Sequence, residues 1–238
     1  MTICILLAPK KPTSAFKQRG FSLVEMAVVL VILGVLLGSL ISPLSTQRDL
    51  SKMRQAEQQL AEVNRALIGF AVLNGRLPCP ATNASNGQAL PVLGTVNCTQ
   101  EHGFLPARTL GIDGSYNNNL LLDPWNNPLL YSLTTANGGA YSLQITANLN
   151  AGNYRICNQN TCAANEIIAE NVVAVIHSRG KDGATAAASP NQQENADADN
   201  DFVKTTYSEA VNNEFDDIVA WLSPNIIALE TLRAGNLP

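Results

Sequence analysis

The stretch Arg19-Gly20-Phe21-Ser22-Leu23-Val24-Glu25 opens an apolar run that reaches Ile41. The leader before it is basic, ends in glycine and contains no acidic residue. Glu25 is the anomaly, because an acidic side chain at the centre of a bilayer costs about 2.5–3.5 kcal/mol, and less near the interface. A plain membrane anchor gains nothing from this charge. We therefore expect Glu25 to have a cationic partner.

The partner that the spacing favours is an α-amino group. If the chain is cut after Gly20, Phe21 carries a new amine, which is largely cationic near neutral pH. Phe21 and Glu25 are four residues apart and so lie on one face of a helix. In a helical assembly, Glu25 of one subunit can instead reach the amine of its neighbour. That second arrangement would set the axial stagger between subunits.

This junction resembles the N-terminus of type IV prepilins and of the pseudopilins of type II secretion. In that family a prepilin peptidase cuts after the glycine on the cytoplasmic side and methylates the new amine. The resemblance implies that Gly20 is the cleavage position, Phe21 the methylated residue and Glu25 the assembly residue. An ordinary secretory signal and an uncleaved single-span anchor stay open as alternatives. The run from Met26 to Ile41 is nevertheless longer than the roughly 7–15 apolar residues of a signal core.

Charge and length agree with an exported domain behind one membrane span. The chain has 238 residues, and four of its 15 basic residues lie in the leader. The chain from Phe21 therefore carries 11 basic and 19 acidic residues, a net charge of −8. This balance argues against general nucleic-acid binding, which depends on Lys and Arg contacts to phosphate. A basic leader before an apolar segment also places the N-terminus in the cytoplasm and the head in the periplasm.

One long N-terminal helix is predicted over residues 21–74, following a leader peptide at residues 1–20. Residues 21–42 are long enough to cross a bilayer. Pro43 is expected to bend the helix, with helix termination as the alternative. Residues 45–73 have an amphipathic pattern, and Asn74-Gly75 is a stop signal. The predicted apolar stripe consists of Leu50, Met53, Leu60, Val63, Leu67 and Phe70.

The remainder, residues 75–238, is predicted to be one globular head. Residues 81–119 are rich in Asn, Gly, Ser and Pro, which indicates a long loop with little regular structure. Because the expected strands follow one another without intervening helices, the predicted fold class is α+β, with the long helix packed on an antiparallel sheet that carries loop insertions. Strands are expected at 129–134, 141–148 and 167–177, with a Gly138-Gly139 hairpin, a strand or helical turn at 216–222 and a terminal helix at 225–233.

Four cysteines remain after Cys4 is lost with the leader. An even number in an exported domain suggests disulfides, although four cysteines allow three pairings. We favour the two pairs that are local in sequence, Cys79–Cys98 and Cys157–Cys162, each of which closes a polar loop. A zinc site with four cysteine ligands is the alternative, although the chain lacks a C-x2-C pair.

A second resemblance covers parts of the head. Asp123-Pro124-Trp125-Asn126-Asn127-Pro128-Leu129-Leu130-Tyr131 is similar to the Asp-Pro-Trp-Gly-Asn-Pro-x-x-Tyr segment of secretion pseudopilins. Asn126 replaces the glycine, and we expect the turn to persist because asparagine tolerates positive φ. Residues 178–183 and 216–218 resemble the pieces that flank the family's calcium loop. The long insertion at residues 184–215 and the disulfide loop fit a minor pilin-like subunit better than the major secretion pseudopilin.

The insertion is acidic, with Glu194 followed by Asp197-Ala198-Asp199-Asn200-Asp201. Alternating acids can direct oxygen atoms at a hard cation, and calcium takes about six to eight oxygen ligands. A solvated acidic loop is the alternative. The predicted calcium ligands are Asp182, Asp197, Asp199, Asp201 and Asp216.

No enzyme is predicted. The chain has two histidines, His102 and His177, and neither a phosphate-binding glycine loop nor an H-E-x-x-H motif. We expect a structural pilin-like subunit of a type IV pilus or a type II secretion pseudopilus, held in the inner membrane. Its expected partners are the prepilin peptidase and other pilin or pseudopilin subunits. The alternative is a filament-tip adhesin or ligand-binding module that a pilin helix delivers.

Overall fold

The computed structural model describes residues 20–91, 98–134, 152–183 and 189–235, and for residues 38–46 it describes the backbone alone. The chain forms two compact units, which divide between Gln47 and Arg48. The predicted strand at 141–148 and the hairpin glycines at 138–139 lie outside the described residues.

Helix α1 (Leu23–Asn74) contributes to both units. It continues through Pro43, so this proline does not end the helix. The predicted stop is confirmed, because Gly75 adopts a left-handed φ of 69° and its N–H donates to the Ala71 carbonyl at 2.9 Å. Within the described residues, we find no helix with an apolar stretch sufficient to cross a membrane. The predicted span of residues 21–42 runs into the segment whose side chains are not described.

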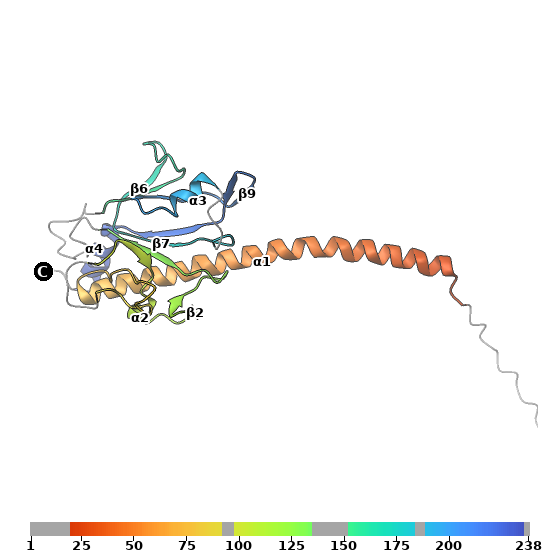
Figure 1. Cartoon of the computed structure of the whole chain (residues 1–238), viewed down its shortest axis with the longest axis horizontal. Coiled ribbons are helices and arrows are strands. Elements are labelled where there is room, and N and C mark those ends of the chain that lie inside the picture. The colour runs from red at the N-terminus through yellow and green to blue at the C-terminus, as the bar shows by residue number, and fades with distance from the viewer. Residues whose placement is uncertain (1–19, 92–97, 135–151, 184–188, 236–238) are drawn as a thin grey trace, which may run out of the picture. The chain divides into compact units, whose positions relative to one another are not determined.

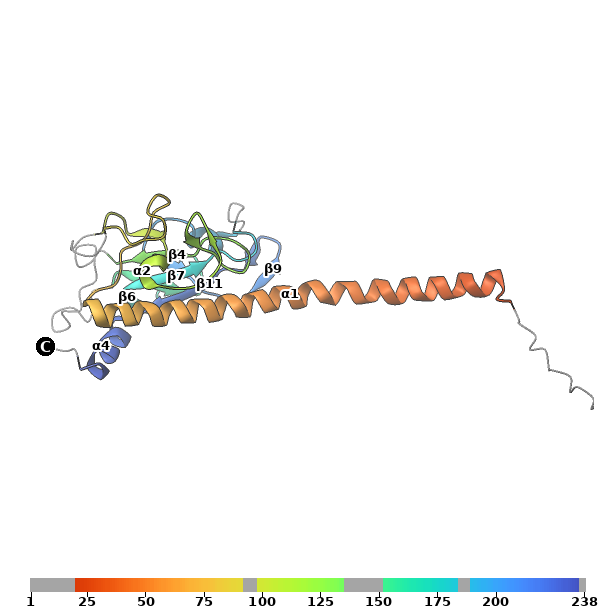
Figure 2. The ribbon, with the colours of Figure 1, turned by 90° about the horizontal axis from the view of Figure 1, so that it is seen from below.

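The second unit has three layers, which Figures 1 and 2 show from two sides. The C-terminal half of α1 covers one face of a four-stranded antiparallel sheet, and a three-stranded sheet covers the other face. The four-stranded sheet has the order β1 (His102–Phe104), β4 (Leu130–Leu133), β7 (Ala174–Ser178) and β11 (Ile218–Leu222). The three-stranded sheet has the order β6 (Ile167–Val172), β5 (Tyr154–Cys157) and β8 (Asp201–Val203).

Strand β7 shows how the layers are held together. Successive side chains of a strand point to opposite faces. Ile176 therefore joins the core under α1, where Leu67 is fully buried, and Val175 joins the core with Tyr154 and Phe202 on the other face. Because β7 lies between two cores, it is buried at every position, including the polar His177 and Ser178.

The short elements lie around these layers. Two-stranded pairs are formed by β2 (Tyr116–Asn117) with β3 (Leu120–Leu121), and by β9 (Ser208–Ala210) with β10 (Asn213–Phe215). The short helices are α2 (Ala107–Leu110), α3 (Pro190–Glu194) and α4 (Pro224–Arg233). Helix α4 confirms the expected terminal helix. Of the two alternatives for residues 216–222, the strand is correct from Ile218 onward.

Several sequence-based predictions need correction. Residues 81–119 were expected to be irregular, but they supply the edge strand β1 and helix α2. The expected strand at 167–177 is two strands in different sheets, which meet at Val173, and Asn171 near the end of the first takes a left-handed φ of 57°. The sheets are not wholly antiparallel, since β5 pairs in parallel with β8. The insertion at 184–215 supplies that strand, and so completes a sheet instead of forming a loop.

The apolar stripe of α1 is also corrected. Leu60, Val63 and Leu67 are buried as predicted. Leu50, however, is 45% exposed, and Ala56 and Ala71 are fully buried. A pattern read from large apolar residues does not detect these buried alanines.

Both cysteine pairs that are local in sequence are disulfide-bonded. Cys79 is joined to Cys98 and Cys157 to Cys162, with Cα atoms 5.3 Å apart in each pair. This separation lies within the usual range of roughly 4.4–6.8 Å. The pairing leaves no thiolate for the alternative zinc site.

The packing of α1 predicts unequal effects for two leucines of the same helix. We expect Leu67→Ala to lower the free energy of unfolding of the head by about 2–5 kcal/mol, because it leaves a cavity between α1 and the sheet. Leu50→Ala, at the exposed position, should change it by less than about 0.5 kcal/mol. Urea unfolding followed by tryptophan fluorescence measures both values. Equal effects at the two positions would contradict the described packing.

Candidate functional site

Helix α1 begins with a capping box at the junction that the sequence analysis singled out. The Val24 N–H donates to Ser22 Oγ at 3.3 Å, and the Ser22 N–H donates to Glu25 Oε2 at 3.5 Å. The Glu25 carboxylate is thus directed back toward residue 22, next to the residue that a cut after Gly20 would make the new N-terminus. It also lies in the first helical turn, where the helix dipole favours a negative charge.

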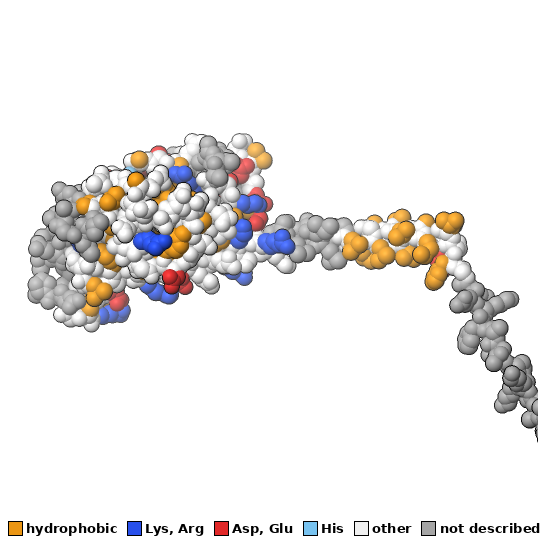
Figure 3. Space-filling view, turned by 60° about the horizontal axis from the view of Figure 1, so that its bottom comes forward, with side chains coloured by type: hydrophobic (Ala, Val, Ile, Leu, Met, Phe, Trp, Pro, Cys, Tyr) orange, Lys and Arg blue, Asp and Glu red, His pale blue; other side chains and the backbone are white. Residues whose placement is uncertain are grey.

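The rest of this helical segment exposes apolar side chains. Every residue from Phe21 to Leu37 is exposed, and the large apolar side chains among them are between 45% and 91% accessible (Figure 3). Glu25 is the one charged residue in this range. An apolar surface of this extent is a site for another protein or for a membrane. The junction therefore combines a directed carboxylate with a surface that its own unit leaves uncovered.

In the head, the Asp123–Asn127 segment forms the turn that the second resemblance predicted. Asp123 Oδ1 accepts hydrogen bonds from the N–H groups of Trp125 and Asn127, at 2.9 and 2.8 Å. Asn126 has a φ of 71°, and its N–H donates to the Asp123 carbonyl at 3.0 Å. The expectation that asparagine supplies the positive φ in place of glycine is confirmed.

The three family-like segments of the head meet at this turn. Ser178 Oγ donates to Asp123 Oδ2 at 2.5 Å, and Asn127 Nδ2 donates to the Gly180 carbonyl at 2.7 Å. Gly180 has a φ of 63°, and a Cβ placed on it would lie 2.4 Å from the Asp216 carbonyl oxygen. Residues 123–131, 178–183 and 216–218 are therefore one structural unit, in which glycine is required at position 180.

The structure does not bring the five predicted calcium ligands into one site. Asp182 and Asp216 lie together, and both accept hydrogen bonds from Gln192. Asp199 and Asp201 lie instead with Glu194, with carboxylate oxygens within 4.8 Å of one another. The two groups are separate because helix α3 lies between Asp182 and the Asp197–Asp201 segment in the sequence. Its residue Gln192 contacts Asp182 and Asp216.

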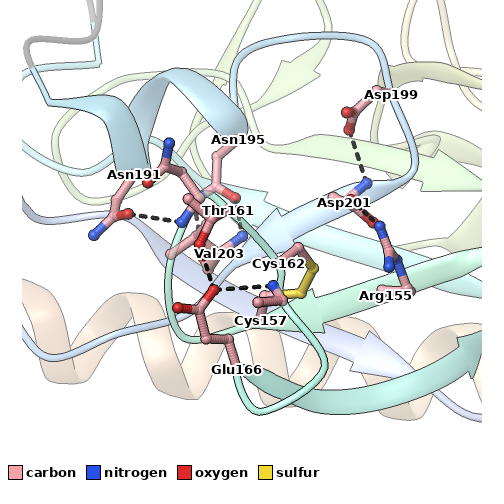
Figure 4. The surroundings of a disulfide bond; sticks show 12 residues. Arg155, Cys157, Thr161, Cys162, Glu166, Asn191, Asn195, Asp199, Asp201 and Val203 are labelled. Carbon is pink, nitrogen blue, oxygen red and sulfur yellow. Dashed lines mark hydrogen bonds and ion pairs between the residues drawn. A yellow bond between two sulfur atoms is a disulfide. The ribbon is translucent and has the colours of Figure 1, made fainter.

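The second group is partly neutralised by a cation of the chain itself. Arg155 forms an ion pair with Asp201, and its Nε donates to Asp201 Oδ1 at 2.7 Å (Figure 4). Asp199 Oδ1 accepts from the Asp201 N–H at 2.8 Å. Asp197 stands next in this loop, and its Oδ1 accepts from the Asp199 N–H at 3.4 Å. The arrangement is a partly exposed acidic loop in which Arg155 pairs with one of the carboxylates.

Burial changes the acidity of several carboxyl groups near α3. It raises the pKa of Asp217 to about 7. Burial, followed by the charge of Asp199, raises the pKa of Glu194 to about 7. The pKa of Asp216 is also raised, first by burial and then by the neighbouring Asp182 carboxylate. Burial therefore disfavours the charged form of each of these carboxyl groups.

The histidines do not form an accessible catalytic site. His102 Nδ1 lies 2.9 Å from Ser132 Oγ, but Ser132 is buried in the sheet and cannot meet a substrate. His177 is 3% exposed and packs against Phe202 at a ring distance of 5.7 Å. Burial, followed by the charge of Arg179, lowers the pKa of His177 to about 3. A neutral histidine in this position is a core residue.

Sequence reasoning missed several residues that organise these sites. The Ser22-x-x-Glu25 capping box was readable from the sequence, because Ser three residues before Glu at the start of an apolar run is its signature. Gln192, Asn195 and Asp217 gave no comparable signal, since their roles depend on which segments the fold brings together.

Comparisons with known proteins agree with these observations. Residues 15–41 match the family model of the prokaryotic N-terminal methylation motif. A type II secretion system core protein G of Pectobacterium carotovorum subsp. carotovorum is 32% identical over 112 residues, which are 47% of this chain and 65% of that protein. The protein of the same name from Pseudomonas aeruginosa is 30% identical, over 48% of this chain and 73% of that protein. No solved structure matches the chain.

The chain therefore belongs to the family of type II secretion system core protein G, a family of structural pseudopilins. The resemblance stated from the N-terminal junction is thereby confirmed. The matched part is about two thirds of the length of the Pectobacterium relative.

The burial of neutral His177 predicts a loss of stability in acid. Its pKa is about 3 in the folded chain and 6.5 as an unperturbed group, so its contribution is present above pH 6.5 and is lost as the pH falls toward 3. We expect His177→Leu, which cannot titrate there, to gain stability relative to the native chain across this window. Urea unfolding of both chains at several pH values measures the difference. A difference that stays constant with pH would refute this account of His177.

Proposed function

We propose that this chain is a structural pilin-like subunit, which prepilin peptidase cuts between Gly20 and Phe21 and methylates on Phe21. It assembles through its N-terminal helix into a type II secretion pseudopilus or a type IV pilus. The observation that carries this proposal is the Glu25 carboxylate, directed toward the N-terminal end of a helix whose neighbouring side chains are apolar and exposed.

Electrostatics explains why the carboxylate and the cut belong together. In an apolar layer, an isolated carboxylate or ammonium is strongly disfavoured, but the two groups attract each other and offset part of that cost. Processing creates the ammonium group at the same end of the helix as Glu25. A neighbouring subunit then supplies the amine, and the pair fixes the register in which the apolar surfaces pack.

The proposal also assigns the parts of the chain. Residues 1–20 are the leader, residues 21–74 the helix and residues 75–238 the head. Residues 21–42 hold the processed chain in the inner membrane as a single span, with the head in the periplasm. The insertion at 184–215 and the loop closed by Cys79–Cys98 add surface to the head. A major subunit packs against copies of itself on all sides, so such additions suit a minor subunit better.

Two substitutions at Glu25 separate its charge from its role in the cap. Glu25→Gln keeps a side chain that can complete the capping box, whereas Glu25→Ala removes it. We expect both variants to insert in the membrane and to begin at Phe21, but to enter sheared filaments at least about tenfold less than the native chain. Filament and membrane fractions measured by immunoblotting, with N-terminal sequencing, give the result.

Glu62→Ala, which removes an exposed acid from the second half of α1, is the control and should assemble normally. Normal assembly of Glu25→Gln with defective Glu25→Ala would assign Glu25 to helix capping alone. A mature chain that starts at a residue other than Phe21 would refute the assigned processing site.

A second candidate function, a ligand-binding module at the filament tip, is favoured by an uncharged hollow in the head. The hollow has a volume of about 600 Å³, and none of its lining residues is charged. Carboxamides and hydroxyls line it beside the ring of Tyr207, and the Cys157–Cys162 disulfide holds one wall. Such groups suit a neutral oligosaccharide, whose hydroxyls pair with amides and whose C–H face contacts an aromatic ring. Lining side chains include Asn158, Gln159, Asn191, Thr206 and Asn213.

The hollow predicts binding of neutral oligosaccharides. We expect the native chain to retain a subset of neutral sugars on a glycan array. The double variant Asn158→Ala/Asn213→Ala should bind them at least about tenfold more weakly, because two donor and acceptor groups are lost. Asn83→Ala, an exposed amide outside the hollow, should bind normally. If no neutral sugar binds the native chain, the second candidate is rejected and the assembly proposal is unaffected.

A further inference from the structure

Helix α3 is docked on the buried pair Asp216–Asp217 by two side-chain amides. The helix is capped by Ser189, whose Oγ accepts from the Gln192 N–H at 3.4 Å and donates to the Glu214 carbonyl at 2.5 Å. Gln192 and Asn195 are three residues apart, so they project from one side of this turn. They are 3% and 2% exposed, and we call these two residues the amide latch.

Gln192 lies between two carboxylates. Its Nε2 donates to Asp216 Oδ1 at 2.7 Å and lies 3.3 and 3.2 Å from the two carboxylate oxygens of Asp182. The other oxygen of Asp216 accepts from the N–H groups of Lys181 and Asp182, at 2.6 and 3.2 Å. One amide nitrogen therefore faces three carboxylate oxygens in a buried position.

Asn195 makes the second connection. Its Nδ2 donates to Asp217 Oδ2 at 2.8 Å and to the Val203 carbonyl at 3.0 Å. Its Oδ1 accepts from the Val203 N–H at 2.7 Å. The amide thus joins strand β8, which the insertion supplies, to the carboxylate that precedes β11. The amide latch therefore connects the insertion to Asp216 and Asp217, the two acidic residues that precede β11.

A calcium ion, which the resemblance implies for this region, does not fit the observed arrangement. Calcium binds oxygen atoms, and it needs about six to eight of them around a common point. Here the point that faces Asp182 and Asp216 is taken by a nitrogen that carries hydrogen atoms. The N–H groups already satisfy carboxylate oxygens that a cation would otherwise bind.

We propose that the amide latch replaces the cation, so that this head closes its 178–217 segment without a metal. Gln192 reduces the repulsion between Asp182 and Asp216 by donating N–H groups to both carboxylates. Asn195 stabilises the Asp217 carboxylate by donating an N–H group to it. The head then keeps its fold in media that lack calcium. The proposal is independent of how the N-terminal helix assembles.

One rival arrangement uses the same residues. If the Gln192 amide is turned over, its oxygen faces the carboxylates of Asp182 and Asp216, and the three groups become a set of oxygen ligands. That arrangement brings like partial charges together and is stable only with a cation between them. The two arrangements therefore predict opposite responses to calcium and to a chelator.

The test measures the melting temperature of the full processed chain in detergent, with millimolar EDTA or with millimolar calcium. We expect the native chain to melt at the same temperature in both. Gln192→Glu has the same shape but adds a third carboxylate, so it should melt at least about 4 °C lower in EDTA. Calcium should restore this loss, because the substitution creates the oxygen set that the native chain lacks.

Two further variants make the outcome decisive. Gln193→Glu introduces the same charge at the adjacent exposed position and should melt like the native chain in both media. The double variant Gln192→Glu/Asp182→Asn returns the cluster to two carboxylates and one amide, and should recover in EDTA without calcium. It also covers the case in which Gln192→Glu alone does not fold. A native chain that is stabilised by calcium and destabilised by EDTA would overturn the proposal, as would a Gln192→Glu chain that behaves like Gln193→Glu.

Discussion

The structure depends on the contrast between the two halves of helix α1. From Leu60 to Ala71 the helix buries a stripe of side chains against the four-stranded sheet, and that contact organises the head. From Phe21 to Leu37 the same helix exposes large apolar side chains, which the described residues of its unit leave uncovered. Because apolar area in water is unfavourable in proportion to its size, this half is a stable surface only against lipid or other subunits. The head buries a core of its own, whereas the apolar surface of the N-terminal half needs lipid or another subunit to cover it.

The parts of the fold that the sequence predicted are those with strong local signals. Asn74-Gly75 ends a helix by backbone preference, and Asp123-Pro124-Trp125-Asn126-Asn127 forms a turn because each residue contributes to it locally. Strand β1 has three residues and no alternation of its own, and it is a strand because β4 lies beside it. The parallel pairing of β5 with β8 joins segments more than forty residues apart, and no local pattern can indicate such a partner.

The candidate sites show the same difference between local and long-range determinants. The junction at Gly20 was readable because its chemistry lies within a few consecutive residues. The acidic residues of the insertion were not, because a carboxylate looks the same in sequence whether it faces solvent, an arginine or an amide. Asp201 meets Arg155, and Asp216 meets Gln192, and these partners come from other elements of the fold. The role of a carboxylate is thus decided by its ion-pair or hydrogen-bond partner in the folded chain.

Glu25 and Asp216 pose the same physical problem and have opposite solutions. Asp216 is buried beneath helix α3, and in the assembly proposed above Glu25 lies in an apolar layer. For Asp216 the donor is an amide of the same chain, Gln192 Nε2, at 2.7 Å. For Glu25 the described part of the chain offers the N–H of Ser22, which cannot neutralise a full charge. In the two proposals made above, an amide of the same chain takes the place of a cation in the head, whereas the amine that pairs with Glu25 comes from a neighbouring subunit.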